Sequence, residues 1–477
     1  MYMAINSDVR VPIPTLEYNR YVEIVNDTNF PKISTTRQAP YGPVEVLEFS
    51  KYAVLTYDIN SVTRSQPNAQ PFGDNASLDG FGKLRVTSPR TLFDAKQIAG
   101  KLPQVFDEVV SGSGASSTFQ PGDSYTLMST TSSGDYVIRQ TTIHFNYQPG
   151  KSLLAYFTGV FKPELNITKR IGLFQGLSSA PYLPSDGIFI ESVDGPNGYI
   201  AFRVLKTAGT PYALSAAQMD WNLDKLDGSG PSGVSVNFDY AQLLVIDYEW
   251  LGVGRIRCGF NVGGRTIYAH QFTHSGLVTP YMTSGSQPVR YEIRQTGTGS
   301  GTLRHICSSV MSEGGEEHIG TSVTAEMTDP AGVAIVTTGY RPIFAIRLAP
   351  NAHDLALVIT KLNMLNVGNS DAIYKVVQNP IISGGSLSFT TLATNPNIQV
   401  ANGSATLSLS GGYDISSGYA GKSNSSVANG QGSSDFLGEL SIVGTKIDGT
   451  SDVFVIAAKG VGGSSTMYAA IDMTLRG

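Results

Sequence analysis

Residues 255–272 read RIRCGFNVGGRTIYAHQF, and this stretch decides the fold. In its first eight residues apolar side chains alternate with Arg, Gly and Asn, so an extended chain places the two kinds on opposite faces. Gly263 and Gly264 come next, and glycine accepts the positive φ angles of a two-residue hairpin turn. An apolar run at 243–246 precedes the stretch, and VRYEIR at 289–294 alternates again. We therefore predict the middle of an antiparallel sandwich sheet, with one face buried and the other exposed to solvent.

The composition excludes several classes of protein. The chain has 477 residues, of which 52 are glycine and only 15% are charged, and its formal net charge is −5. Such a length exceeds one hydrophobic core, so two or three domains are expected. The small net charge does not indicate a nucleic-acid-binding surface. No apolar run approaches the roughly 20 residues of a membrane-spanning helix. Residues 1–8 lack the regions of a signal peptide, so we expect folding in a reducing cytoplasm.

The predicted architecture is all-β: two antiparallel β-sandwich or jelly-roll-like domains preceded by an extended N-terminal arm. Prolines at 12, 14, 31, 40 and 43 interrupt any helix in residues 1–75, which we expect to be a docking arm. Alternating segments with turn signals between them predict a large sandwich over residues 76–318. The composition changes at 312–330, and residues 319–477 are predicted to form a smaller C-terminal sandwich.

Two segments depart from the strand pattern. Residues 88–98, with Pro89 near their start, are the best candidate for a short helix. Residues 410–435 are rich in Gly and Ser and too long for a simple connection. We expect this loop to be either mobile or ordered by a partner.

Metal binding and disulfide formation are weakly indicated. His270 and His274 are four residues apart, but on a strand end and loop this spacing does not place both side chains on one face, so we interpret them as polar strand or turn residues. The segment from Asp220 to Gly230 looks like a calcium loop without its alternating oxygens and terminal Glu, which favours a rigid turn over a structural cation site. Trp221 within it is expected in the core.

Cys258 and Cys307 match no zinc motif and are expected to be buried small hydrophobes.

One pair of carboxylates invites comparison with enzymes. Asp247 and Glu249 are two residues apart on a predicted strand and share a face, as the acid and nucleophile of some sandwich glycosidases do. Arg255 and Arg257 are close in sequence, and an ion-paired outer face explains the same residues without catalysis. The sequence contains no nucleophile elbow, P-loop or dinucleotide fingerprint. We therefore predict no enzyme, and assign no catalytic, cofactor-binding or metal-ligating residue.

Several blocks of the sequence resemble a group of virion structural proteins found in tailed phages of environmental bacteria and in some large DNA viruses. The similar blocks are SLDGFGKLRV (77–86), TLFD (91–94), FNYQPGKS (145–152), WLGVGR (250–255) and RYEIR (290–294). The resemblance covers roughly residues 75–300, is looser toward the C-terminus, and does not extend to residues 1–75. It implies a place in a virion and carries no catalytic residue with it.

The resulting hypothesis is a phage virion structural protein, made in the host cytoplasm and carried on the particle. We expect a tail-associated fibre, spike or baseplate component that contacts host surface glycans, joined to other virion proteins through its N-terminal arm. A homotrimer is the favoured assembly. The alternatives are a head decoration or head-fibre protein and, from another class, a β-sandwich glycan hydrolase using Asp247 or Glu249.

Overall fold

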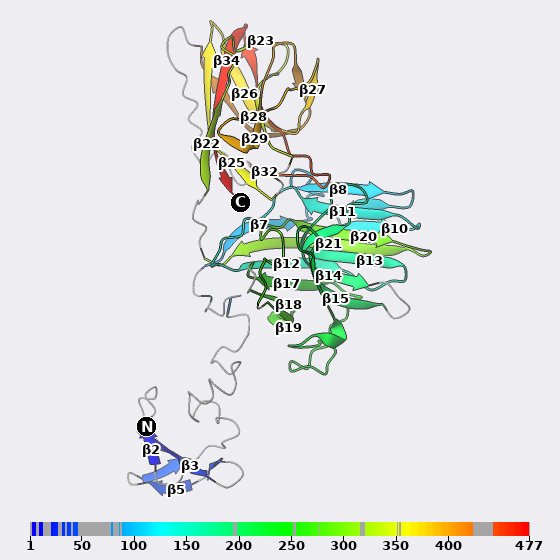
Figure 1. The fold of residues 1–477 in the computed structure, drawn as a ribbon, viewed down its shortest axis with the longest axis vertical. Coiled ribbons are helices and arrows are strands. Elements are labelled where there is room, and N and C mark those ends of the chain that lie inside the picture. The colour runs from blue at the N-terminus through cyan, green and yellow to red at the C-terminus, as the bar shows by residue number, and fades with distance from the viewer. Residues whose placement is uncertain are drawn as a thin grey trace. The chain divides into compact units, whose positions relative to one another are not determined.

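The structure is a computed structural model, and it is built almost entirely from β-strands (Figure 1). It describes residues 78–79, 85, 88–193, 198–250, 254–274, 276–314, 320–350, 352, 354–422 and 442–476, together with the backbone of six short strands before residue 46. The chain divides into two compact units, Met1–Leu78 and Asp79–Gly477. In the described residues no helix is long and apolar enough to cross a bilayer.

The first unit contains the segment predicted as a docking arm. Its strands are β1 (Tyr2–Ile5), β2 (Val9–Pro12), β3 (Tyr21–Asn26), β4 (Pro31–Ile33), β5 (Thr36–Ala39) and β6 (Gly42–Glu45). Strand β1 pairs antiparallel with β2 and parallel with β3, while β5 and β6 form a separate pair. Residues 46–77 lie outside the described part. The docking function expected for residues 1–75 stays a prediction.

The large sandwich occupies the first part of the second unit. One sheet consists of β7 (Arg90–Lys96), β9 (Ser116–Gln120), β10 (Tyr125–Thr130), β12 (Leu153–Val160), β17 (Gln242–Tyr248), β18 (Arg255–Val262), β19 (Arg265–Thr273) and β21 (Gly301–Ser312). The other consists of β8 (Phe106–Ser111), β11 (Tyr136–Thr141), β13 (Ile167–Gly176), β14 (Pro184–Val193), β15 (Tyr199–Lys206), β16 (Tyr212–Ala217) and β20 (Val289–Gln295).

Both sheets of the large sandwich are antiparallel, which confirms the predicted fold class. Their strand orders are β19-β18-β17-β12-β21-β10-β9, with β7 beside β21, and β16-β15-β14-β13-β20-β11-β8. Apolar side chains from the two inner faces, among them Phe157, Phe202, Phe260 and Tyr291, are fully buried in one continuous core. Burial of this apolar area is the main stabilising term of such a sandwich.

The hairpin between β18 and β19 forms as the sequence predicts. Val262 pairs with Arg265 across a two-residue turn, in which Gly263 and Gly264 have φ angles of 59° and 80°. Positive φ at both central positions is the geometry that matches the right-handed twist of the flanking strands. The two glycines therefore fix the register of this pair of strands.

The smaller sandwich follows after residue 320. One sheet comprises β22 (Thr321–Glu326), β23 (Val333–Ile335), β25 (Ala356–Val367), β32 (Ile442–Val443) and β34 (Ser465–Arg476), and the other β24 (Arg341–Leu348), β26 (Asp371–Gln378), β28 (Thr390–Leu392), β29 (Asn395–Asn402), β31 (Tyr413–Ala420) and β33 (Phe454–Val461). A short pair, β27 (Ile381–Ser383) and β30 (Ser408–Ser410), completes it. Its core is a separate cluster of buried residues that runs from Val323 to Met473 in sequence. Strand β21 ends at Ser312 and β22 begins at Thr321, so the two cores separate on either side of the predicted boundary.

Two local predictions were wrong. Residues 90–96 form strand β7, not a helix, because they pair antiparallel with the long strand β21 and bury Phe93 and Ala95 on alternate positions. This long-range pairing outweighs the weak local helix signal. The predicted loop at 410–435 contains strand β31 (Tyr413–Ala420), which pairs with β26, and its residues 423–435 lie outside the described part.

The two sandwiches contact each other through a loop between β32 and β33. The backbone N–H of Thr445 donates to the carbonyl of Thr142 at 2.7 Å, and that of Ile447 donates to the Asp107 carboxylate at 2.9 Å. Gly444 lies directly against the Thr142 carbonyl, where a Cβ atom would approach the oxygen to 2.2 Å. A side chain at position 444 would therefore force the two sandwiches apart.

Candidate functional site

Asp247, one of the two carboxylates compared above with those of glycosidases, lies on the outer face of the sheet that contains β17, β18 and β19. Asp247 on β17 forms ion pairs with Arg257 on β18 and with Arg85, whose Nη2 is 2.9 Å from the carboxylate. The Tyr268 hydroxyl on β19 donates to the same oxygen at 3.3 Å, and the Arg257 guanidinium lies 4.3 Å from the centre of the Tyr268 ring. The predicted ion pairing is confirmed.

The prediction that this face is exposed to solvent was wrong. Asp247 and Arg257 are both fully buried, with exposed fractions of 0%. Arg85, from the segment that enters the large sandwich, lies over Asp247 and also pairs with Glu313. The apolar side chains of Leu154 and Val245 cluster with Tyr268 on the same face. A polar strand face can thus be covered by the protein's own chain instead of by water.

Glu249 follows the end of β17 and has a different environment. Its side chain is 8% exposed, and the guanidinium of Arg255 is 3.9 Å away. Burial raises the pKa of Glu249 to about 7, against the partial compensation of Arg255. Glu249 could therefore exchange a proton near neutral pH, but its neighbour Asp247 is already held by two guanidinium groups.

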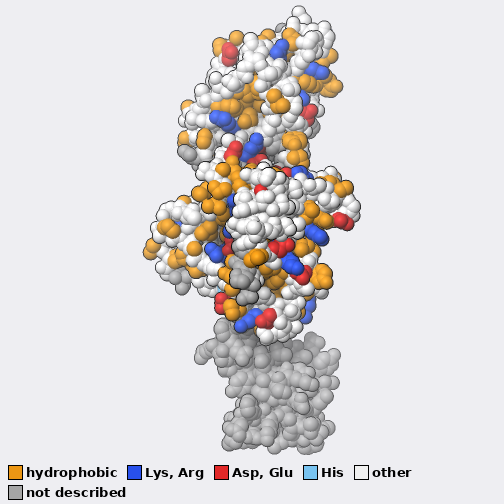
Figure 2. Space-filling view, turned by 90° about the vertical axis from the view of Figure 1, so that its right-hand side faces the viewer, with side chains coloured by type: hydrophobic (Ala, Val, Ile, Leu, Met, Phe, Trp, Pro, Cys, Tyr) orange, Lys and Arg blue, Asp and Glu red, His pale blue; other side chains and the backbone are white. Residues whose placement is uncertain are grey.

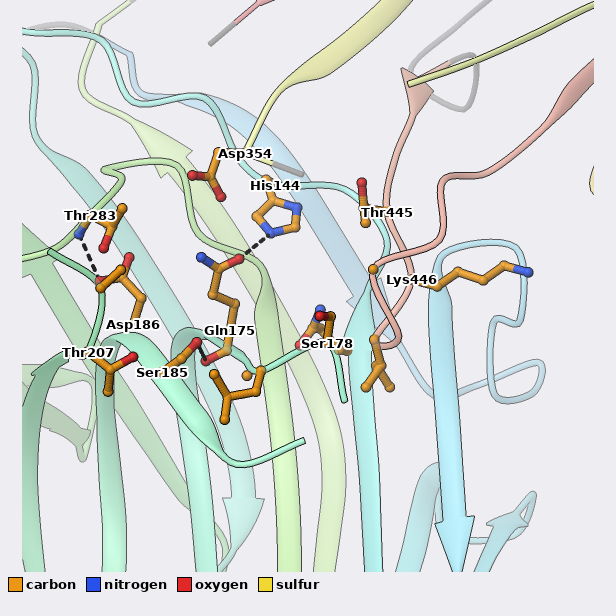
Figure 3. Close-up of a pocket in the computed structure, with 16 residues that line it drawn as sticks. His144, Gln175, Ser178, Ser185, Asp186, Thr207, Thr283, Asp354, Thr445 and Lys446 are labelled. Atoms are coloured by element: carbon orange, nitrogen blue, oxygen red, sulfur yellow. Dashed lines mark hydrogen bonds between the residues drawn. The ribbon is translucent and has the colours of Figure 1, made fainter. Parts of the chain in front are cut away.

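A polar cavity of about 300 Å³ lies elsewhere in the second unit (Figure 3). The large sandwich contributes Gln140, His144, Gln175, Asp186 and Thr283 to its lining, and the small sandwich contributes Asp354, Thr445 and Lys446. Neither Asp247 nor Glu249 lines it. No motif in the sequence marks these residues, because they come from six separate segments that only the packing of the two sandwiches brings together.

Several polar groups in the cavity are fixed by hydrogen bonds. The Asp186 carboxylate accepts from the backbone N–H of Thr283 at 2.8 Å and from the Gln287 amide at 2.6 Å. Burial nevertheless raises the pKa of Asp186 to about 6. The imidazole Nε2 of His144 lies 3.3 Å from the Gln175 side-chain oxygen. The lining is therefore partly pre-organised, as binding sites for small molecules commonly are.

The other residues singled out in the sequence have structural surroundings. The His270 Nδ1 accepts from the backbone N–H of Asn222, and the His274 Nδ1 lies 2.9 Å from the Gly254 carbonyl oxygen. Both imidazoles are largely buried. Among the residues that the structure describes, no group of three or more His, Cys, Asp or Glu side chains could hold a metal ion.

The segment from Asp220 to Gly230 forms a rigid turn, as the sequence favours. The Asp224 carboxylate accepts from the backbone N–H groups of Leu226 and Ser232, at 2.9 and 2.8 Å. Trp221 is 3% exposed and stacks on Phe202, which confirms its place in the core. Cys258 is buried as predicted, whereas Cys307 is half-buried, and neither forms a disulfide.

The sequence block RYEIR forms the buried centre of the second sheet. It lies on β20, where Glu292 pairs with Arg290, Arg294 and Arg170. Burial alone would raise the pKa of Glu292, but the three guanidinium groups together lower it to about 2. This block therefore stabilises the fold and does not present groups to a ligand.

Comparison with known proteins found matches among solved structures only. No protein-family model matches the chain, and no curated protein matches it. Among solved structures, the carbohydrate recognition domain of Emp47p is 11% identical with a TM-score of 0.30, covering 48% of this chain and 97% of that one. A legume lectin-like domain from Entamoeba histolytica is 11% identical with a TM-score of 0.30, over 47% and 98% of the two chains. The Bacillus licheniformis beta-glucanase is 10% identical with a TM-score of 0.30, over 48% and 99%. None of these comparisons tests the resemblance to virion proteins, which stays a prediction.

Proposed function

We propose that this protein is a non-catalytic structural component of a phage virion, associated with the tail as part of a fibre, spike or baseplate. The first unit joins it to other virion proteins, and the sandwiches face outward toward the host surface. Support for the virion assignment comes from the sequence blocks between residues 75 and 300. A homotrimer remains our expectation for its assembly.

The main support for the non-catalytic assignment is the burial and ion pairing of Asp247. A carboxylate that acts on a substrate must be reachable, whereas Asp247 is fully buried and held by Arg85 and Arg257. The surface supports a contact function as well: Figure 2 shows Lys, Arg, Asp and Glu side chains scattered among uncharged ones on the visible face, with no single charged patch. A weakly charged surface limits nonspecific attraction to nucleic acid and membranes.

The test is to identify the protein in purified particles by mass spectrometry and to locate it by immunogold labelling. We expect label at the tail. Label on the capsid faces would replace the tail assignment by the head decoration or head-fibre alternative, and absence from purified particles would overturn the virion assignment. Light scattering on the purified chain tests the trimer, and a stable monomer at high concentration would contradict it.

A second candidate function is glycan hydrolysis with Glu249 as the general acid. The observation in its favour is the pKa of about 7, which suits proton transfer near neutral pH. The experiment is an assay of reducing-end release from soluble glucans, with the wild-type chain and the Glu249→Gln variant compared. We expect no release from either protein. Release by the wild type that is lost in the variant would establish the hydrolase instead.

A further inference from the structure

The cavity between the two sandwiches contains polar atoms that the described residues leave without partners. Asp354 and Thr445, both from the small sandwich, line the cavity. The Asp354 Oδ1 and the Thr445 Oγ are buried, and neither has a hydrogen-bond partner among the residues that the structure describes. Each unsatisfied buried polar atom costs roughly 1–3 kcal/mol. A ligand that bonds to both atoms would therefore recover free energy that the unliganded protein lacks.

The chemistry of these atoms restricts the ligand. A carboxylate oxygen accepts hydrogen bonds only, so Asp354 requires a donor, whereas the hydroxyl of Thr445 both donates and accepts. Hydroxyl groups of a saccharide satisfy both requirements, because each hydroxyl both donates and accepts. Leu177 and Ile447, which also line the cavity, offer apolar contact to the C–H groups of such a ring.

The charge of the lining argues against an anionic ligand. Asp186 and Asp354 bring two carboxylates to the cavity, and Asp354 contributes to the raised pKa of Asp186 by repulsion. Lys446 is a cation of the lining, and Figure 3 shows its side chain directed away from the other labelled residues. An acidic sugar or a phosphate would meet a negative potential there.

The size of the cavity limits the ligand further. Its volume of about 300 Å³ is at the lower end of the range for small-molecule sites, which is roughly 300–1,000 Å³. It can hold a short terminal segment of a glycan, and a longer chain would have to extend into solvent. Affinity for an isolated sugar should be weak, on the order of millimolar, and several copies on one particle would raise it by multivalency.

We propose that the cavity lined by Asp354, Thr445 and Gln175 binds an uncharged saccharide unit of a host surface glycan. In the bound state a sugar hydroxyl donates to the Asp354 carboxylate, a second one pairs with the Thr445 hydroxyl, and Gln175 contacts the ring from the large sandwich. This inference rests on the proposed function for the source of the glycan. The site itself can be tested on the isolated protein.

The experiment is saturation-transfer NMR on the full chain at pH 7, with the methyl glycosides of glucose, galactose, mannose and N-acetylglucosamine, and with N-acetylneuraminic acid as the anionic probe. We expect at least one neutral glycoside to bind and the anionic probe to give no signal. Asp354→Ala should weaken the binding at least tenfold, and Thr445→Val several-fold. The matched controls are Asp239→Ala and Thr390→Val, which change residues outside the cavity lining and should leave the affinity unchanged.

Three outcomes would overturn the inference: no neutral glycoside binds, the anionic probe binds as tightly, or Asp354→Ala binds like the wild type. Circular dichroism of each variant shows that it is folded. A second variant, Asp354→Asn, keeps the shape of the side chain, and its reduced affinity would show that the charge contributes. If the protein is present in purified particles but binds no glycoside, only this inference fails. If it binds glycosides but is absent from particles, the virion assignment fails instead.

Discussion

Asp247→Asn and Glu249→Gln should change the stability of the large sandwich in opposite directions, although the two positions are only two residues apart. Asp247 supplies the negative charge that faces Arg257, and both side chains are fully buried. Removing that charge leaves a buried guanidinium without its counter-ion, and breaking a buried ion pair typically costs about 3–5 kcal/mol. Asn retains one acceptor oxygen, so we expect a loss near the lower end, about 3 kcal/mol.

For Glu249 we expect the opposite change: removing the charge raises the free energy of unfolding at neutral and alkaline pH. Its pKa in the folded protein is about 7, above the ordinary value of 4.5, so the folded chain binds this proton more tightly than the unfolded chain. The free energy of unfolding therefore falls as the pH rises from about 4.5 to 7. Each pKa unit is worth about 1.36 kcal/mol, so the wild type loses up to about 3 kcal/mol over this range. Glu249→Gln carries no such titration, and should match the wild type near pH 4.5 and exceed its stability by about 1–3 kcal/mol at pH 8.

The assay is urea unfolding followed by tryptophan fluorescence at pH 4.5, 6 and 8. The chain has two tryptophans, Trp221 and Trp250, and both belong to the large sandwich, so the signal reports the domain that carries the substitutions. Equal stability of Asp247→Asn and the wild type would refute the structural role of the buried ion pair. A Glu249→Gln variant that is less stable than the wild type at pH 8 would refute the effect that we assign to burial of this carboxylate.

Two further predictions concern the junction of the sandwiches and the cysteines. Gly444→Ala places a Cβ within 2.2 Å of the Thr142 carbonyl oxygen, so it should destabilise the contact between the sandwiches by about 1–3 kcal/mol. The measurement is the rate of proteolysis, which should increase. Gly421→Ala is the matched control, because no atom lies within 4 Å of a Cβ at that position. An unchanged cleavage pattern would contradict this contact. In the native protein a thiol-reactive dye should label Cys307 and leave Cys258 unmodified, because burial of Cys258 is complete and raises its pKa. Equal labelling of both would show that the core is more open than the structure indicates.

The sequence alone determines the class of fold, because its evidence is local. Alternation at 255–262 requires a strand with two unlike faces, and Gly263 with Gly264 requires a tight turn after it. The turn around Asp224 also follows from nearby residues, since its carboxylate accepts from backbone groups two and eight positions further along the chain. Such features depend on spacing within a few residues, and spacing is what a sequence records.

Tertiary structure decided the rest, because the deciding partners are distant in sequence. Alternation shows that Arg257 lies on a polar face, but only the approach of Arg85 and the neighbouring apolar cluster makes that face buried. Residues 90–96 became a strand through pairing with β21, more than 200 positions away. The cavity between the two sandwiches exists only because Asp354 and Thr445 of one sandwich are placed against the end of the other. Pairwise contacts between separate domains leave no periodic pattern in either segment, so the chain has to fold before such a site can be recognised.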